Sequence, residues 1–534
     1  MSPRPQVHHL QHHLLWPLRL LPAASGGRQE PQHAWQRLAA LQSHGWQLQD
    51  KLAPGQQRFH ERHYQEFVTF LPFVQKVLYG EGGEGVQGAG MRVFRREDIA
   101  WLRVWLREDQ EPLLLDVVHV DLYTFVDVSV VLLNIEFSAC DLPLDVVHEL
   151  LYRLGRAYPS GWDEEDRPLH SLAKAQWLGP LGQVLCESDS AERDQFIEHV
   201  RAHRTPRIAS HWSHVLAPLL PEHDPQEAAL RYRQIEYYRM PVMAYLAVDD
   251  PGELSAADFR SLAWISGAPG AQAHATQRLD EAFLQQHADD RYWGPEGRAP
   301  QTRYLSCGHA LVVVGRADST YFRCHERGVL AQFRHQHFLL FLLAHFQKAA
   351  LLMYSDKMVE ALAQLDAKDV DSVKRFKRAI RRCFEGFLRY THRYGFHSVA
   401  QQAHARSIHE RLKRQLGVAE LHEEVRTRIE GMADYLETDS VRRQANTVVK
   451  LTVVTIFGLV GTVTTGFLGM NLLAEADASW DRRLWIFLLT FGLTSLLTGY
   501  TLVKAKKLSD LLDALSDERL GVREKLQAAW RALR

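Results

Sequence analysis

The sequence predicts an α+β (α/β-like) cytosolic domain, followed by a long helical stalk and two C-terminal transmembrane helices. Three observations predict this arrangement. Strand-like apolar runs stop before residue 334, helical periodicity dominates residues 334–445, and two uncharged apolar runs occupy 451–468 and 484–503. With 534 residues, the chain is long enough to bury a sizeable core.

The predicted organisation has seven segments. The first three are a His-containing N-terminal segment (1–34), the α/β domain (35–333) and a helical region with the stalk (334–445). They are followed by the first transmembrane helix with its cytosolic entry (446–471), an extracytoplasmic loop (472–483), the second transmembrane helix (484–504) and a cytosolic C-terminal helix (505–534). Lys and Arg number 63 against 64 Asp and Glu, so the net charge does not indicate a nucleic-acid partner.

The N-terminal segment begins with a group of histidines and a short apolar run. Pro17 and Arg19 interrupt that run at 14–22, which is unlike a cleavable signal peptide. On a helix, two imidazoles of this group would share one face and suit Zn2+ or Ni2+. No Cys or carboxylate lies nearby, so we expect a flexible tail instead. The histidines are His8, His9, His12 and His13.

Strand signals concentrate in two parts of the α/β domain. Residues 112–138 are rich in Val, Ile, Phe and Leu and predict two or three strands. Residues 142–158 follow with helical spacing and Asp145 near the first turn. A second candidate hairpin joins 303–315 to 319–333.

The cysteines number five and are scattered, which favours reduced thiols in the cytosol over a disulfide framework. Two of them would meet two histidines across the candidate hairpin as a zinc site. Core cysteines and surface histidines are the simpler explanation, and we expect that one. The four residues are Cys307, His309, Cys324 and His325.

Residues 334–445 read as helices. The apolar spacing of 335–365 predicts a long buried helix, and a basic helix follows at about 369–391. Its basic cluster favours exposure to solvent or anionic partners over a nucleic-acid site: Lys374, Arg375, Lys377, Arg378, Arg381 and Arg382. A third helix begins after Gly395. From about 420 no proline stops it, so we expect a charged stalk that runs unbroken into the first apolar run.

The two apolar runs contain 18 and 20 uncharged residues, and each matches a hydrocarbon core of about 30 Å. Two such runs rarely occur together as buried core helices. Six basic residues flank the outer ends of the pair, against two in the loop between the runs, Arg482 and Arg483. Both termini are therefore expected in the cytoplasm. The six are Arg442, Arg443, Lys450, Lys504, Lys506 and Lys507.

Gly469, Met470 and Asn471 close the first apolar run, and 444–452 lead into it. With the short loop, second span and basic tail that follow, this pattern resembles the CorA-type divalent-cation (Mg2+) transporter family. The resemblance is specific over about 430–507 and architectural before that. It implies a homopentamer in membrane lipid, with the first span lining the pore and the three motif residues forming the selectivity filter.

The motif suits the chemistry of Mg2+, which prefers oxygen ligands and releases its water reluctantly. A ring of Asn471 carboxamides would hold the hydrated ion loosely enough to release it. Gly469 would let the helix end and expose backbone carbonyls.

One face of the first span carries four polar residues among seven, which indicates a pore lining. Tight helix packing through Thr and Gly, with Gly458 and Gly461 nearby, is the alternative. The seven pore-lining candidates are Asn446, Val449, Thr452, Thr455, Leu459, Thr462 and Gly466.

Acidic residues flank the span on both sides. Glu475 and Asp477 stand in the outer loop, where they either attract cations or form an ordinary solvated loop. This loop lacks the proline that many relatives carry after the motif. Asp434, Glu437 and Asp439 lie on the stalk, where they either bind regulatory Mg2+ between subunits or form a solvated face.

The functional expectation is a divalent metal cation channel or transporter, with Mg2+ first and Co2+ or Ni2+ next, in a bacterial inner (plasma) membrane. The alternatives are a Zn2+ transporter of the same fold and a non-conducting, membrane-tethered sensor or scaffold. The sequence has no nucleophile elbow, Walker loop, zincin helix or dinucleotide fingerprint, so we expect no enzyme and no cofactor apart from Mg2+ itself.

Overall fold

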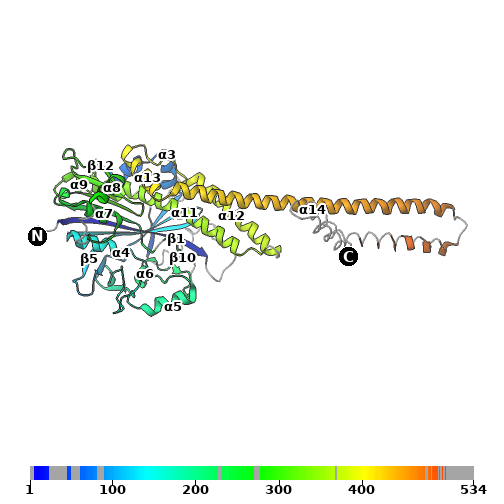
Figure 1. Cartoon of the computed structure of the whole chain (residues 1–534), viewed down its shortest axis with the longest axis horizontal. Coiled ribbons are helices and arrows are strands. Elements are labelled where there is room, and N and C mark those ends of the chain that lie inside the picture. The colour runs from blue at the N-terminus through cyan, green and yellow to red at the C-terminus, as the bar shows by residue number, and fades with distance from the viewer. Residues whose placement is uncertain are drawn as a thin grey trace. The chain divides into compact units, whose positions relative to one another are not determined.

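The computed structural model describes residues 5–22, 45–49, 61–80, 89–226, 230–236, 238–269, 277–366, 370–474 and 479–482, with short stretches between 484 and 500. The chain divides into two compact units, Met1–Ile429 and Glu430–Arg534. The first unit contains the sheet and the helices up to α13 (Figure 1). Most of the long helix α14 (Val418–Ala474) belongs to the second.

The described strands of the first unit form one 14-stranded mixed sheet, which agrees with the expected α+β class. The strands are β1 (Gln6–Pro22), β2 (Trp46–Gln49), β3 (Met91–Arg96), β4 (Trp101–Trp105), β5 (Leu113–Phe125), β6 (Val128–Pro143), β7 (Lys174–Leu178), β8 (Val184–Glu187), β9 (Leu220–Pro221), β10 (Leu230–Gln234), β11 (Val242–Val248), β12 (Ala288–Tyr292), β13 (Thr302–Ser306) and β14 (Ala310–Arg316).

The main path through the sheet runs β12-β13-β14-β11-β1-β6-β5-β4-β7-β8. Off this path, β10 pairs with β1 and β9, and β3 pairs with β5 and β2. Only β11–β14 and β9–β10 are parallel among these pairs. The strands predicted at 112–138 are confirmed as the antiparallel pair β5–β6. The helix predicted after them is confirmed as α4, with Asp145 in its first turn.

The N-terminal strand β1 lies in the middle of the sheet, so the expected flexible tail is wrong for residues 6–22. One edge of β1 pairs with β6; the other pairs first with β11, over 7–14, and then with β10, over 18–22. Pro17 falls between these two partners, where the missing N–H costs the sheet least. Burial on both faces removes the polar–apolar alternation that marks a half-exposed strand.

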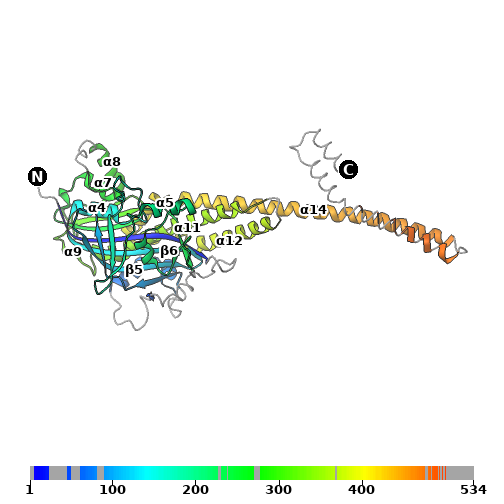
Figure 2. The same cartoon turned by 90° about the horizontal axis from the view of Figure 1, so that it is seen from below.

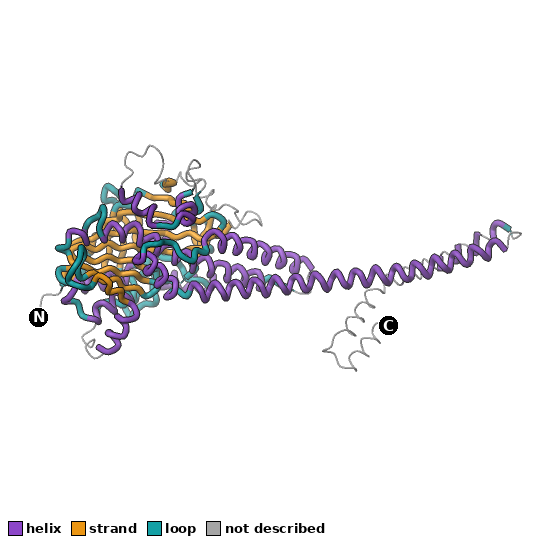
Figure 3. Tube along the Cα trace, turned by 90° about the horizontal axis from the view of Figure 1, so that it is seen from above, coloured by secondary structure: helices purple, strands orange, loops and turns teal. Residues whose placement is uncertain are grey.

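Helices cover both faces of this sheet, as Figure 3 shows with helices in purple and strands in orange. They are α2 (Glu61–Thr69), α3 (Pro72–Tyr79), α4 (Leu144–Leu154), α5 (Arg193–His203), α6 (Ser210–Leu216), α7 (Ala256–Trp264), α8 (Gln277–His287), α9 (Thr320–Arg323), α10 (Val329–Gln332), α11 (Phe338–Ala363), α12 (Val370–Tyr394) and α13 (Ala403–Gln415), with a 3-10 turn η3 (Pro251–Glu253) and a π turn η5 (Phe333–His337).

Alternate residues of β1 separate the two layers. Leu14 belongs to the main apolar core and lies against the end of α4, where a Cβ on Gly155 would come 2.8 Å from it. On the opposite face, the His13 ring stacks on Phe338 of α11 with centroids 4.8 Å apart. Arg19 on that face pairs with Glu360 of α11 at 2.7 Å. The β1 backbone thus joins the α4 layer to the α11 layer.

The second candidate hairpin, which joined 303–315 to 319–333, is wrong. The first of its two predicted strands is itself a hairpin of β13 and β14, turning at Gly308, whose φ of +78° favours glycine. Its second predicted strand contains the short helices α9 and α10 and the start of η5. Ser319 starts α9 because its side chain accepts a hydrogen bond from the Phe322 backbone N–H.

The predicted buried helix is confirmed as α11, which packs on β1 and β6 and lies beside α12 (Figure 2). Among the described residues, Val329–Ala363 is long and apolar enough to cross a membrane. Of its most apolar window, 83% is buried inside the first unit, which is the environment of a core helix. The basic cluster of α12 lies on the exposed side of that helix, as expected.

Candidate functional site

The candidate site is built on α14, the helix that carries the Gly-Met-Asn motif. Gly417, with φ +64°, separates α13 from α14. The first turns of α14 pack on the first unit through Val418, Val425 and Ile429, which are at most 5% exposed. From there the helix continues without a break to Ala474. The prediction that the stalk runs unbroken into the first apolar run is confirmed for the backbone.

The helix does not end at Gly469, so that expectation is wrong. Residues 469–471 are still helical, and α14 continues to Ala474. A single glycine lowers helix propensity by about 1 kcal/mol, which is too little to end a long helix. Asn471 instead opens the last turn. The carbonyls of a last turn have no partner within the helix, and they carry the negative end of the helix dipole.

The threonines of the predicted pore face share one hydrogen-bonding pattern. The hydroxyls of Thr452, Thr455 and Thr462 each donate to the backbone carbonyl four residues earlier, at 2.8–2.9 Å. Thr465, which the sequence interpretation missed, does the same at 2.9 Å. Because the single hydroxyl proton is used inside the helix, each side chain presents only acceptor lone pairs to its surroundings. Such oxygens can face a cation.

The glycines of the same helix bear on the alternative of tight packing. Apart from the helix's own backbone, no described atom lies within 4 Å of a Cβ built at Gly458, Gly461 or Gly466. The described residues therefore show no tight helix packing through these glycines.

The second apolar run is helical wherever residues between 480 and 500 are described. Its large apolar side chains are open in the isolated chain; Leu489 is 68% exposed and Leu493 is 70% exposed. Trp480, Trp485 and Tyr500 lie near the two ends of this run. Aromatic residues at both ends are typical of membrane interfaces, and an exposed apolar surface of this kind marks contact with lipid or another protein.

Several predicted site residues lie outside the described part of the chain. Glu475 and Asp477 are among them. The backbone is helical but the side chains are outside the described set at Glu437, Asp439, Asn446, Leu459, Gly469, Met470 and Asn471. Of the others, Asp434, Thr452, Thr455, Thr462 and Gly466 are exposed and Val449 is half-buried. Their roles remain predictions.

The histidines do not form the sites considered from the sequence. His8 lies between Asp249 and Asp141, at 2.6 and 2.9 Å, and hydrogen bonds to Asp141 and then Asp249 raise its pKa. His12 stacks on Phe137 and His13 on Phe338, on opposite faces of β1. No group of three or more His, Cys, Asp or Glu in the described ranges is arranged to hold a metal ion.

The other zinc site considered from the sequence comprised Cys307, His309, Cys324 and His325. Cys307 Sγ and His309 Nδ1 lie 3.8 Å apart, and burial raises the pKa of the Cys307 thiol to about 12. This agrees with the simpler interpretation of Cys307 as a core cysteine.

Residues 352–504 match the sequence model of a family described as CorA-like Mg2+ transporter protein. The match begins within α11 and runs through α12, α13 and α14 into the second apolar run. No curated protein and no solved structure matches the chain significantly. The resemblance inferred from the Gly-Met-Asn motif is thus confirmed over this part of the chain. The family implies a membrane protein that transports divalent cations.

Proposed function

We propose that the chain is a channel or transporter for a divalent metal cation, with Mg2+ as the principal cargo. One observation carries this proposal. The family match covers the whole of α14 and its motif at 469–471, together with most of the stalk that leads to it. The sheet lies outside the match.

The donor atoms favour Mg2+ over Zn2+ as cargo. The segments 451–471 and 484–503 contain no His, Cys, Asp or Glu. Apart from the Met470 thioether they offer hydroxyl, carboxamide and backbone oxygens, which suit a hard cation. Zn2+ prefers imidazole and thiolate ligands. Neutral oxygens also hold a divalent ion weakly enough for release, which conduction requires.

The oligomer follows from the size of the pore. Two helices cannot enclose a hydrated ion, so several subunits have to contribute. A homopentamer, as the family resemblance implies, would turn the outward oxygens of Thr452, Thr455 and Thr462 into rings along the pore. The motif residues Gly469, Met470 and Asn471 would then form the filter at the end of α14.

The charged flanks complete the proposal. Both termini lie in the cytoplasm, and the loop that contains Glu475 and Asp477 faces outside and draws cations toward the filter. Asp434, Glu437 and Asp439 bind Mg2+ between neighbouring stalks and favour the closed state.

Uptake into proteoliposomes tests this function directly. We expect the purified chain to transport Mg2+, with less transport of Co2+ and Ni2+ and least of Zn2+, measured with the same amount of reconstituted protein. Protein-free liposomes supply the background. Zn2+ uptake above that of Mg2+ would favour the Zn2+ transporter of the same fold. No uptake of any of the four ions would favour the sensor or scaffold.

A further inference from the structure

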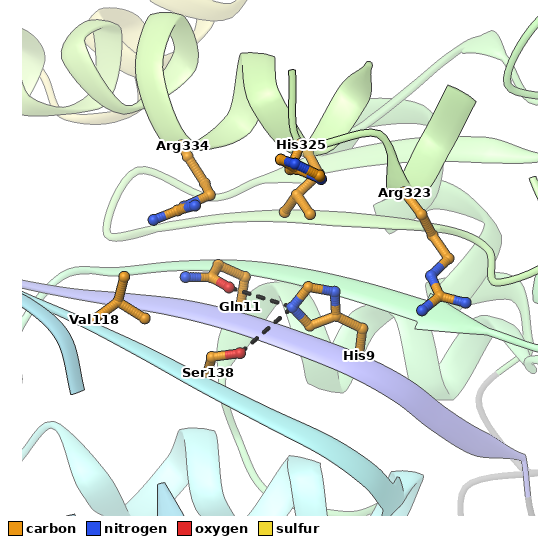
Figure 4. A pocket seen from close by; sticks show the side chains of 8 residues that line it. His9, Gln11, Val118, Ser138, Arg323, His325 and Arg334 are labelled. Carbon is orange, nitrogen blue, oxygen red and sulfur yellow. Dashed lines mark hydrogen bonds between the residues drawn. The ribbon is translucent and has the colours of Figure 1, made fainter. Parts of the chain in front are cut away.

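A cavity of about 360 Å³ lies between the sheet and the α9–η5 segment of the first unit. Figure 4 shows His9 and Gln11 on β1 and Ser138 on β6 facing Arg323, His325 and Arg334 across it. The cavity is far along the chain from the predicted pore and belongs wholly to the first unit. Its lining contains two guanidinium groups and two imidazoles but no carboxylate.

One of the two guanidinium groups is already neutralised. Arg334 Nε donates to the buried carboxylate of Glu136 at 2.5 Å. Burial alone would raise the pKa of Glu136, but the charges of His13 and Arg334 lower it to about 2, so the carboxylate stays ionised. Arg334 and Glu136 therefore form a balanced pair at the back of the cavity.

This pair also fixes the polar wall of the cavity. Gln11 Nε2 donates to Glu136 at 2.5 Å, so the amide oxygen of Gln11 turns toward His9 Nε2, at 3.3 Å. That nitrogen must then carry the proton and donate it. Ser138 Oγ lies 3.4 Å from the same nitrogen. No described residue hydrogen-bonds to His9 Nδ1, which carries no proton and can therefore only accept a hydrogen bond from a ligand.

Arg323 supplies the charge that the cavity leaves unbalanced. It is the last residue of α9 and is exposed, and no carboxylate in the described ranges pairs with its guanidinium. Arg316, a few residues earlier, shows the ordinary surface arrangement, because Asp318 neutralises it at 2.6 Å. The charge of Arg323 reaches the cavity, since it lowers the pKa of His9 after the larger effect of burial.

We propose that this cavity binds a small molecule through an oxyanion, a phosphate or a carboxylate group, with Arg323 and the His325 imidazole as its partners, while the unprotonated Nδ1 of His9 accepts a hydrogen bond from a hydroxyl group of the same molecule. The planar fork of a guanidinium matches two oxygens of such a group. Val118 and Leu330 also line the cavity and would contact an apolar remainder of the molecule. The volume lies at the lower end of the range for ligand pockets, which suits a small metabolite.

Thermal melting of the full chain in detergent micelles tests this site. The probes are inorganic phosphate and acetate, titrated at constant ionic strength. A ligand that binds only the folded state raises the melting temperature with concentration. We expect this rise in the parent chain, and at least about a tenfold weaker apparent affinity in Arg323→Gln, the effect of losing one charge-assisted hydrogen-bonding group. A response to phosphate but not acetate would assign a phosphate ligand, and the reverse a carboxylate.

The control is Arg201→Gln, which removes an exposed arginine from α5 and should respond like the parent. Equal affinity in Arg323→Gln and the parent would overturn the proposal, as would a parent chain that responds to neither anion. Melting of the first unit does not require ion flux. The outcome is therefore independent of whether the chain transports Mg2+.

Discussion

Two apolar stretches of similar length have opposite surroundings in this chain. α11 and the second apolar run, 484–503, both read as long apolar helices. In α11, Leu342 and Leu343 are 0% exposed, because the sheet, α12 and α13 cover the helix. In the second run, Leu493 is 70% exposed. Apolar composition alone does not distinguish a core helix from a membrane span. The distinction comes from whether other parts of the chain pack over the apolar helix and bury it.

The same comparison separates two kinds of polar residue. α11 carries a titratable group inside its apolar surface, His345, which is fully buried. The runs 451–468 and 484–503 carry no His, Asp, Glu, Lys or Arg, and their polar side-chain atoms are hydroxyl groups and the indole nitrogen of Trp485. A protein core can hold a neutral imidazole, whereas a membrane span avoids any ionisable group that does not serve transport.

The largest expected effect comes from a charge inside α11. Leu342→Asp buries an unpaired carboxylate and should cost more than about 4 kcal/mol, a large part of the stability of a typical domain. We expect the first unit to lose its cooperative melting transition and its protease resistance. Leu362→Asp, at a position 52% exposed on the same helix, should melt like the parent. Equal melting of all three proteins would mean that α11 is not a core helix.

The matching change in the second run should act on the membrane instead. Leu493→Asp places a carboxylate at the middle of the predicted span, at a cost of about 2.5–3.5 kcal/mol for insertion. We expect a larger share of this variant to be released from membranes by alkaline extraction, while melting of the first unit stays unchanged. Leu493→Ala is the control. If Leu493→Asp instead lowered the melting temperature and left extraction unchanged, the run would be part of a folded core.

Acid should weaken the first unit through α11. Burial, then the nearby positive charges of Lys348 and His309, hold the pKa of His345 well below its usual 6.5. The unfolded chain therefore binds a proton below about pH 6.5 that the folded chain does not, and stability falls as pH falls. His345→Leu should recover about 1–2 kcal/mol of the stability lost between pH 6.5 and pH 5.

Denaturant unfolding at several pH values measures this effect. His392→Leu removes an exposed histidine from α12 and should retain the acid sensitivity of the parent. Parallel stability–pH curves for the parent and His345→Leu would contradict the assignment of a neutral, buried imidazole.

The smallest effects concern two positions of the first run, Thr455 and Gly458. Thr455→Val removes an outward oxygen without changing the shape of the helix, and should lower Mg2+ flux a few-fold if that face lines the pore. Gly458→Ala should leave flux close to the parent value, because no described atom lies near the added methyl group. Flux per assembled oligomer measures both. The opposite pattern would favour tight helix packing over a pore lining.

How far the sequence predicted the fold depended on what surrounds each element. The buried helix at 335–365 and the β5–β6 pair were predictable, because helical spacing and a dense run of β-branched residues survive in any context. β1 was not. Its neighbours β6, β10 and β11 come from residues up to 248, and only these distant strands make a Pro-containing, His-rich segment the centre of a sheet.

The functional residues divide in the same way. The Gly-Met-Asn motif was readable from the sequence because its position after a stalk and an apolar run is informative, and the family match agrees. The cavity of the first unit was not readable. His9, Ser138 and Arg323 are more than 100 residues apart in sequence at each step, and only the sheet brings them together.

Mg2+ flux through Asn471→Ala tests the central claim most directly. Asn471 opens the last turn of α14 and is proposed to present a ring of carboxamides to the hydrated ion. In proteoliposomes that hold equal amounts of assembled protein, we expect Asn471→Ala to lose nearly all uptake while the first unit melts as in the parent. Asn471→Asp should transport poorly and with a steeper pH dependence, because a ring of carboxylates binds the ion tightly and repels itself when empty. Parent-like uptake by Asn471→Ala would contradict the account and leave the motif a structural remnant.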